Sequence, residues 1–352
     1  MGEAGPDFER FKAVLLGQVR DWVPPAELGI DLEVKEAFLG RPISSPADEV
    51  AFWQAAGYDY VIGRIWEPPG ALAPFDWSCP EVAVSHRDTY SVYGDRQAER
   101  SWAREGKGQV TTWQEFESFP WPTADMGGHD LLTEIGNCLP PGMKLIVAEG
   151  RIFHSTWMLM GFESFAYNLV ENPELVGAVF QKVAELRYQA FCRAIELPAV
   201  GAHALGDDIA YATGLLVSPQ VLRQHVFPWY RKFGEICRQL GKPLIYHSDG
   251  KLFEVLDDLI ACGVNALHPI EPKAMDAPEV KRRTGGRLTL VGNIELDRLA
   301  RGTPDEVREL TRERIELVGT GGGYCAGSSN SVTHYVPLEN FRAMIETIRD
   351  YG

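Results

Sequence analysis

The sequence predicts an α/β protein whose strands close into a (β/α)₈ barrel with an irregular N-terminal insertion. Two observations carry the prediction: short apolar runs alternate with longer amphipathic stretches, and several of those stretches begin with a capping residue followed by proline. An open, doubly wound sheet is the alternative. It is disfavoured because no glycine-rich phosphate loop follows any of the apolar runs.

Seven apolar runs are predicted to be strands. The first spans residues 58–62, and six more follow at 144–149, 200–205, 243–247, 265–268, 287–292 and 322–326. An eighth strand is not evident, because residues 67–143 are rich in Pro, Gly and Trp and are interpreted as an irregular insertion with one β-like piece at 108–113. Residues 1–57 are expected to form a helical lead-in, and the whole chain, 1–352, is expected to be a single domain.

Four predicted helices begin at a proline that follows a side chain able to accept a hydrogen bond from the first helical turn. The four pairs are Ser45-Pro46, Asn172-Pro173, Ser218-Pro219 and Thr303-Pro304. Glu306 lies three residues after Thr303, which is the spacing of a capping box. The first of these helices is expected to end near Gly57, and the first strand follows it.

The charge balance and the cysteines narrow the classes of partner and compartment. With 34 basic and 49 acidic residues the net charge is −15, which disfavours nucleic acid and anionic membranes as partners. No run of 18 or more apolar residues and no signal peptide is evident, and the six cysteines are scattered without a CxxC pair. We therefore expect a soluble, cytoplasmic protein without disulfides.

Polar residues follow six of the predicted strands, where the active site of a parallel barrel lies. The predicted catalytic residues are Asp207, Asp208, His247 and Asp249. The predicted substrate-binding residues are Glu149, His154, Tyr211, His268, Glu271, Asn293, Ser329 and Asn330. The sequence therefore predicts one polar cleft at the carboxyl ends of the strands.

Each of these residues also has a purely structural interpretation. The adjacent acids Asp207 and Asp208 could cap the loop before Tyr211, or mutual repulsion could raise the pKa of one of them. Asp249 could be a helix N-cap, with Gly250 permitting the turn. His268 could be packed under a loop. The other histidines, and Cys325 within a strand, are interpreted as structural or surface residues; the histidines are His86, His129, His203, His225 and His334.

Several ordered motifs lie between residues 140 and 352. They are Gly206-Asp207-Asp208, Ser218-Pro219, Phe227-Pro228, Tyr246-His247-Ser248-Asp249-Gly250, Val264-Asn265-Ala266-Leu267-His268-Pro269-Ile270-Glu271-Pro272, Val291-Gly292-Asn293-Ile294, Gly321-Gly322-Gly323-Tyr324, and the terminal Val336-Pro337-Leu338-Glu339-Asn340-Phe341-Arg342-Ala343-Met344. Together they resemble the uroporphyrinogen decarboxylase and cobalamin-methyltransferase superfamily. The resemblance implies a TIM barrel with its cleft at the carboxyl ends of the strands, and it supplies an eighth strand.

The chain departs from the motifs of both chemistries in this superfamily. The arginine-bearing Met-Arg-Gln-Ala-Gly-Arg-like segment of the decarboxylases has no counterpart, since Gln18-Val19-Arg20 is isolated. The methyltransferases carry His-x-Cys and a later Cys that bind zinc, whereas this chain has His247-Ser248-Asp249 and then Asn330, with Cys325 out of register. A thiolate zinc site is thus lost. The remaining His247 and Asp249, with Asp207 or Asp208 and Glu271, could bind zinc or another divalent ion, or act without metal as acids and bases.

The resemblance favours methyl transfer from a small methylated substrate to a corrinoid on a partner protein. A decarboxylase or related lyase that acts on a small or aromatic carboxylic acid is the alternative, and a non-catalytic barrel that binds a ligand is the third. A homodimer is expected by resemblance.

Overall fold

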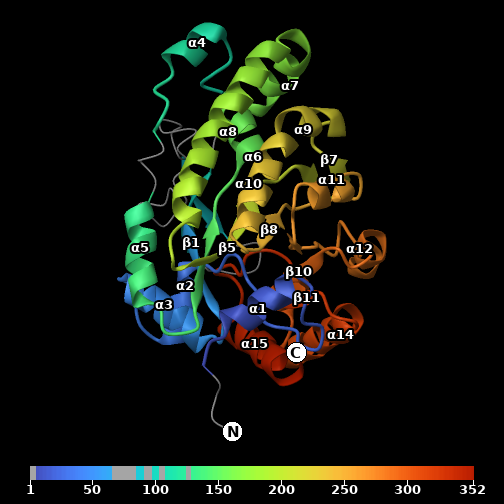
Figure 1. Ribbon diagram of the computed structural model, residues 1–352. Helices are drawn as coiled ribbons and strands as arrows, with labels where there is room; N and C mark the ends of the chain where they lie inside the picture. Colours follow the sequence, from blue (N-terminus) through green and yellow to red (C-terminus); the bar gives the residue numbers. More distant parts are fainter. Residues whose placement is uncertain (1–4, 66–84, 91–96, 103–107, 124–127) are drawn as a thin grey trace.

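The computed structural model describes residues 5–65, 85–90, 97–102, 108–123 and 128–352. At the centre of these residues is a curled sheet of seven parallel strands, in the order β1-β4-β5-β8-β9-β10-β11 (Figure 1). The strands are β1 Tyr60–Arg64, β4 Lys144–Ala148, β5 Val200–Gly206, β8 Leu244–His247, β9 Ala266–His268, β10 Thr289–Ile294 and β11 Tyr324–Ser328. Each overlaps one of the seven predicted runs, so those predictions are confirmed.

The strands are mostly apolar because both faces of the sheet are covered. Every residue of β10 and β11 is buried, as are the first six residues of β5. A parallel sheet with helices outside and side chains inside requires such continuous runs rather than an alternating pattern. Since all seven strands run in the same direction, the loops that follow them gather at one edge of the sheet.

A segment at residues 24–28 lies between β11 and β1, the two outer strands of the sheet. Ala26 N donates to Ala326 O at 2.8 Å, and Ala326 N donates to Pro24 O at 2.9 Å. On the other side, the hydroxyl of Tyr60 accepts from the main-chain N–H of Glu27 at 2.8 Å and donates to its carbonyl at 2.9 Å. The two adjacent prolines have no N–H, so the segment cannot extend into a regular ladder, and no eighth apolar run is evident in the sequence.

Fifteen helices surround the sheet or extend from it within the described residues. They are α1 Phe8–Leu15, α2 Leu32–Leu39, α3 Pro46–Ala55, α4 Trp113–Ser118, α5 His129–Cys138, α6 Ile152–Met160, α7 Phe162–Glu171, α8 Pro173–Ile195, α9 Pro219–His225, α10 Phe227–Gln239, α11 Leu256–Ala261, α12 Ala277–Thr284, α13 Leu296–Arg301, α14 Pro304–Gly319 and α15 Leu338–Tyr351. The long α8 runs from α7, at the top of Figure 1, down to the start of β5.

The four predicted helix starts are confirmed, because α3, α8, α9 and α14 each begin at the expected proline. Ser45 and Thr303 accept hydrogen bonds from the first turn, and Thr303 with Glu306 forms a complete capping box. Asn172 and Ser218 make no side-chain cap bond. At these two starts the proline, whose φ is already helical and whose missing N–H costs nothing there, is the remaining signal.

The insertion contains more regular structure than the sequence predicts. Ser85–Tyr90 (β2) pairs with Gln97–Trp102 (β3) as an antiparallel hairpin. The predicted β-like piece at 108–113 is wrong: the main-chain N–H groups of Gln109 and Val110 donate to Leu159 O, and Thr112 is the N-cap of α4. Thr112 and Glu115 form a capping box, which is a local helix signal stronger than the β-propensity of the preceding residues.

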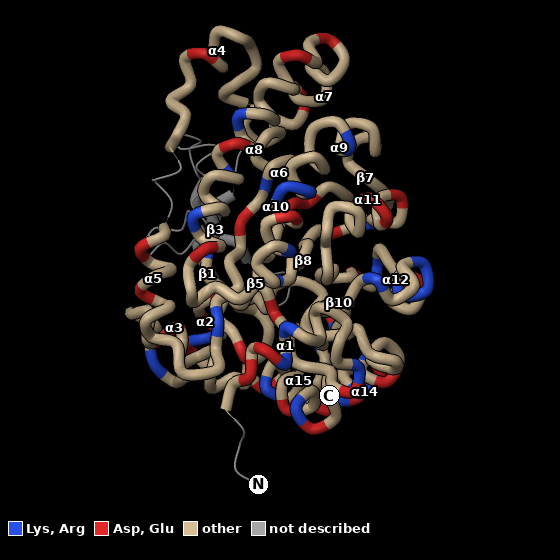
Figure 2. Tube along the Cα trace, viewed as in Figure 1, with Lys and Arg blue, Asp and Glu red and all other residues tan. Residues whose placement is uncertain are grey.

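The outer surface carries charges of both signs. Acidic and basic residues are interspersed over α14 and α15, and the basic residues at the end of α12 lie together (Figure 2). Two of these, Arg282 and Arg283, pair with Glu279 one turn away. In the described part of the chain, none of the helices combines the length and apolar character needed to cross a bilayer. The five described cysteines are free, and Cys325 is buried as expected.

Candidate active site

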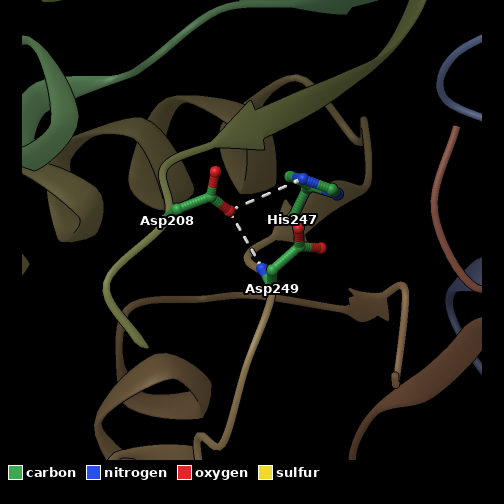
Figure 3. Close-up of side chains that lie close together, drawn as sticks. All are labelled: Asp208, His247 and Asp249. Atoms are coloured by element: carbon green, nitrogen blue, oxygen red, sulfur yellow. Dashed lines mark hydrogen bonds and ion pairs between the residues drawn. The ribbon is translucent and has the colours of Figure 1, made fainter. Parts of the chain in front are cut away.

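Asp208, His247 and Asp249 lie together at the carboxyl end of the sheet (Figure 3). His247 is the last residue of β8, and Asp208 lies two residues after the end of β5. The parallel register places Gly206 beside His247, which brings the ends of the two strands together. Each of the three residues offers one ligand atom, and these atoms lie within 4.8 Å of one another.

Asp208 connects the other two residues. Its Oδ1 accepts the main-chain N–H of Asp249 at 2.9 Å and lies 3.7 Å from Nε2 of His247. The side chains of Asp208 and His247 are 40% and 25% exposed. A ligand from solvent can therefore reach both groups.

The turn after β8 is shaped by Ser248 and Gly250. The Ser248 hydroxyl accepts from the N–H of Ile209 at 3.1 Å and donates to the carbonyl of Asp249 at 2.9 Å. Gly250 has a φ of 86°, and a Cβ there would lie 2.6 Å from the carbonyl of Ala210, so only glycine fits. Asp249 is not a helix N-cap, because α11 begins at Leu256; that structural interpretation is wrong.

The side chain of Asp249 is held by the amide of Asn330, which follows the outer strand β11. The side-chain NH₂ of Asn330 donates to both carboxylate oxygens of Asp249, at 3.1 and 2.9 Å. Burial raises the pKa of Asp249 to about 6; the charge of His247 opposes the shift, and those of Asp208 and Glu271 add to it. Near neutral pH this carboxyl can therefore both accept and donate a proton. The structure thus brings a residue 81 positions away in sequence onto this side chain.

His268 supports His247 from the next strand. The two Nδ1 atoms lie 2.7 Å apart, so one nitrogen donates its hydrogen to the other. Burial, followed by the charge of His247, holds the pKa of His268 well below its usual range. The contact with His268 fixes the orientation of the His247 ring, whose Nε2 lies 3.7 Å from Asp208 Oδ1.

Asp207 faces a different environment from its neighbour. It is 1% exposed, and its carboxylate accepts the N–H groups of Phe153 and His154, at 2.7 and 2.8 Å, and the hydroxyl of Tyr230 at 2.8 Å. The first two lie in the opening turn of α6. Burial raises the pKa of Asp207 to about 7, and repulsion by Asp208 is only a minor cause. These contacts fix α6 to the end of β5.

Glu149 belongs to the same buried region as Asp207. It follows β4 and pairs with Arg187 of α8 at 2.8 Å, with both side chains no more than 5% exposed. The guanidinium of Arg187 also donates to the hydroxyl of Ser155 on α6 at 2.7 Å. The pair therefore joins β4, α6 and α8 instead of facing the three-residue cluster.

The remaining predicted residues contact the main chain or solvent. Asn293 donates to Ile270 O at 2.7 Å, and Ser329 Oγ accepts from Leu296 N at 3.1 Å. The Glu271 carboxylate accepts from the N–H of Gly250 at 3.1 Å, which places it beside the cluster. Tyr211, on the short hairpin formed by β6 Ala210–Tyr211 and β7 Gly214–Leu215, is 65% exposed, and the ring of His154 packs against Trp157.

Two buried charged residues were missed by the sequence analysis. Arg187 lies four residues after Val183 and four before Phe191, on the buried face of α8, and a charge in an apolar stripe was an available signal. Glu27 is fully buried beside Ser328, and its only signal was an acid within the otherwise uncharged run 22–30.

The donor set fits a divalent metal ion. One imidazole nitrogen and two carboxylate oxygens are ligands that zinc and similar ions accept, and His247 has its second nitrogen bonded to His268, as metal-binding histidines usually do. A thiolate is absent from the cluster, so the ligands are of the N/O type.

A parallel α/β sheet with acids, imidazoles and amides at the carboxyl ends of its strands places these groups where the active sites of parallel α/β enzymes lie. The family model described as uroporphyrinogen decarboxylase (URO-D) matches residues 131–351. The chain belongs to this family, within the superfamily that also contains the cobalamin methyltransferases.

The chain is similar to two methyltransferases, one in sequence and one in fold. The chain is 29% identical over 149 residues to the methylcobamide:CoM methyltransferase MtaA of Methanosarcina barkeri, a match that covers 42% of this chain and 41% of that protein. The chain thus matches less than half the length of this relative. A solved methyltransferase from Methanosarcina mazei superposes over 97% of this chain and 98% of its own, with a TM-score of 0.70 and 18% identity. This second likeness concerns the fold.

Proposed function

We propose that the protein transfers a methyl group from a small methylated substrate to a corrinoid carried by a partner protein. The observation that carries the proposal is the cluster of Asp208, His247 and Asp249 at the carboxyl end of the sheet, where a methyl donor can enter from solvent. The 29% identity to a methylcobamide-dependent methyltransferase supports the same chemistry. The departure from that chemistry's thiolate ligands favours a substrate other than a thiol.

Methyl transfer breaks the bond between the methyl carbon and a heteroatom, and the heteroatom leaves with the electron pair. A proton delivered to that atom makes it a better leaving group. Asp249, with its pKa of about 6, can supply the proton, and His247 Nε2 lies on the same side of the cluster. A divalent ion bound by Asp208, His247 and Asp249 would take the place of this proton, because it would keep Asp249 ionised and would itself supply Lewis acidity to the heteroatom.

Asn330 and Asp208 have positioning roles in this proposal. Asn330 fixes the orientation of the Asp249 carboxylate through two hydrogen bonds. Asp208 accepts the N–H of Asp249 and so sets the distance between the two acids. Asp207 fixes α6 at the edge of the site without contacting the substrate. Of the predicted substrate-binding residues, Glu271, His268 and Asn330 lie near the cluster.

Decarboxylation of a small carboxylic acid is the second candidate, because the family model is described by that reaction. The negative charges near Asp249 make decarboxylation less favourable than methyl transfer. Both Asp208 and Glu271 contribute negative charge there, and a substrate carboxylate would be repelled by the same groups.

We further propose that residues 24–28 take the place of an eighth strand, so that the sheet closes as the TIM barrel of this family and the chain forms one domain. Their bridge to Ala326 and their contacts with Tyr60 support closure at this seam.

A single assay separates the two functions. The purified protein is incubated with cob(I)alamin and a panel of methyl ethers and methylamines, and methylcobalamin is followed by absorbance. Parallel incubations with aromatic carboxylates are followed for CO₂ release. Methyl transfer that is lost in Asp208→Asn supports the proposal. CO₂ release without methylcobalamin would replace it with the second candidate, and silence across a broad panel of methyl donors would count against it.

A further inference from the structure

Glu27 places a carboxyl group in the seam between β11 and β1, behind the loop that carries Asn330. The side chain is fully buried. Its Oε1 accepts the main-chain N–H of Ser328 at 2.6 Å, and its Oε2 lies 2.6 Å from the hydroxyl of Ser328. That hydroxyl also contacts the main-chain carbonyl of Asn330. Four polar groups from three residues therefore meet, with Glu27 and Ser328 fully buried and Asn330 partly buried.

The ionisation state of Glu27 follows from counting the hydrogens that are available for its contacts. The Ser328 hydroxyl has one hydrogen, yet it touches both a carboxyl oxygen and a carbonyl oxygen. If Glu27 is ionised, both neighbours can only accept, and one contact has no hydrogen. If Glu27 is neutral, its Oε2–H donates to Ser328 Oγ, and Ser328 Oγ–H donates to the carbonyl of Asn330. Only the neutral form gives each of these polar groups a hydrogen-bond partner.

The chain of hydrogen bonds ends at the candidate site. The carbonyl of Asn330 is fixed by Ser328, and the amide oxygen of Asn330 accepts the N–H of Ser331 at 2.7 Å. These two contacts leave the NH₂ group of Asn330 directed at both oxygens of Asp249. The orientation of an acid in the site thus depends on a group at the opposite end of the sequence.

We propose that Glu27 is a positioning residue of the active site, which acts in its neutral form through Ser328 on the main chain of Asn330. The role of the site itself rests on the function proposed above, but the contacts that carry this inference do not.

The surroundings of Glu27 favour the neutral form. Burial raises the pKa of Glu27 to about 8, against the effect of the hydrogen bonds from Ser328. The titratable groups that interact with its charge are Tyr58, Tyr60 and Tyr324, and Cys325 follows Tyr324 on β11; burial raises the pKa of each of these well above its usual range. Arg64, at the end of β1, donates to the carbonyl of the next residue, Leu28. Glu27 is therefore the group in this seam that titrates just above neutral pH.

Amide hydrogen exchange of residues 328–331 tests the proposal without any substrate. Glu27→Gln is the matched control, because its NH₂ group can donate to Ser328 Oγ while its oxygen accepts the Ser328 N–H. Glu27→Met keeps the size of the side chain and removes both contacts. Ser328→Ala leaves Glu27 in the seam with its Oε1 on the main-chain N–H of residue 328, and removes the hydroxyl that connects Oε2 to Asn330.

At pH 7 we expect Glu27→Gln to keep the protection of the wild type, and both Glu27→Met and Ser328→Ala to exchange at least tenfold faster across residues 328–331. Once corrected for intrinsic exchange, protection of this loop in the wild type falls as pH rises through about 8. In Glu27→Gln it does not fall. If Glu27→Met does not fold, the comparison of Ser328→Ala with Glu27→Gln decides.

Two results would overturn the proposal. One is amide exchange across residues 328–331 that is as fast in Glu27→Gln as in Glu27→Met, which would mean that a charged Glu27 is required. The other is full protection in Ser328→Ala. Either result leaves methyl transfer untouched, whereas an inactive protein with the expected exchange pattern would refute the proposed function alone.

Discussion

Two polar regions at the same edge of the sheet differ in what their side chains are free to do. In the buried region, Asp207 and the pair of Glu149 and Arg187 use their contacts to join α6 and α8 to the strands. In the open cluster, Asp208 and His247 are partly exposed and have room for a ligand. Asp207 and Asp208 are adjacent in one loop, yet the first belongs to the buried region and the second to the open cluster. Solvent exposure therefore distinguishes their roles better than residue type does.

The largest expected effect is the loss of activity in Asp208→Asn. The change removes the charge but keeps an oxygen that can accept the N–H of Asp249, so the fold should be preserved. We expect methyl transfer to fall by about 100-fold or more, because the cluster loses one of the two carboxylates that would hold a divalent ion and, with it, several kcal/mol of charge stabilisation. Asp207→Asn is the isosteric control. Equal losses in initial rate from the two variants, each verified as folded by circular dichroism, would remove the distinction between the regions.

The next effect is on stability in the buried region. Arg187→Met leaves the Glu149 carboxylate buried without its partner, which should lower the free energy of unfolding by about 3–5 kcal/mol. Arg223→Met is the control, since Arg223 pairs with Asp258 at an exposed position and its loss should lower the stability far less. Urea denaturation measures both. A loss for Arg187→Met as small as that of the control would show that the buried pair does not hold the helices.

A smaller effect is expected from the residue behind the cluster. His268→Phe removes the nitrogen bonded to His247 Nδ1 while preserving a ring in the buried position. Zinc affinity, measured with a competing chelator, should fall by about tenfold to 100-fold, as for other partners of metal-binding histidines. An unchanged affinity would mean that His247 does not depend on this contact.

The smallest effect, for each pH unit, is the pH dependence of stability that Asp207 contributes. Because burial raises its pKa to about 7, the folded protein binds a proton there more tightly than the unfolded chain does. The stabilisation is complete below the usual range of an aspartate, near pH 4, and is lost as pH rises to about 7. Relative to Asp207→Asn, the wild type should lose about 1 kcal/mol per pH unit within this window. A constant difference from pH 4 to pH 7 would show that Asp207 is ionised throughout.

The sequence predicted the seven strands well because each is a continuous apolar run buried on both faces. The seam was not predictable from periodicity, because residues 24–28 begin with two prolines and pair through single bridges. The antiparallel hairpin of β2 and β3 has no alternating apolar pattern and was also not predicted.

The sequence predicted part of the candidate site, because it predicted where the strands end. Strand ends locate Asp208, His247 and Asp249 at one edge, since parallel topology gathers them there. Sequence order cannot distinguish Asp207 from Asp208, because the direction of each side chain depends on α6 and on Tyr230, which lie far away in the chain. Glu27 and Ser328 are 301 residues apart, and no local pattern connects them.

Zinc titration by calorimetry tests most directly whether Asp208, His247 and Asp249 form one ligand site. We expect the metal-free wild type and Asp207→Asn to bind one equivalent of zinc with similar affinity. Asp208→Asn and His247→Ala should lose this binding while remaining folded. Equal binding by all four proteins, or loss of binding in Asp207→Asn alone, would contradict the assignment of the open cluster as the functional site.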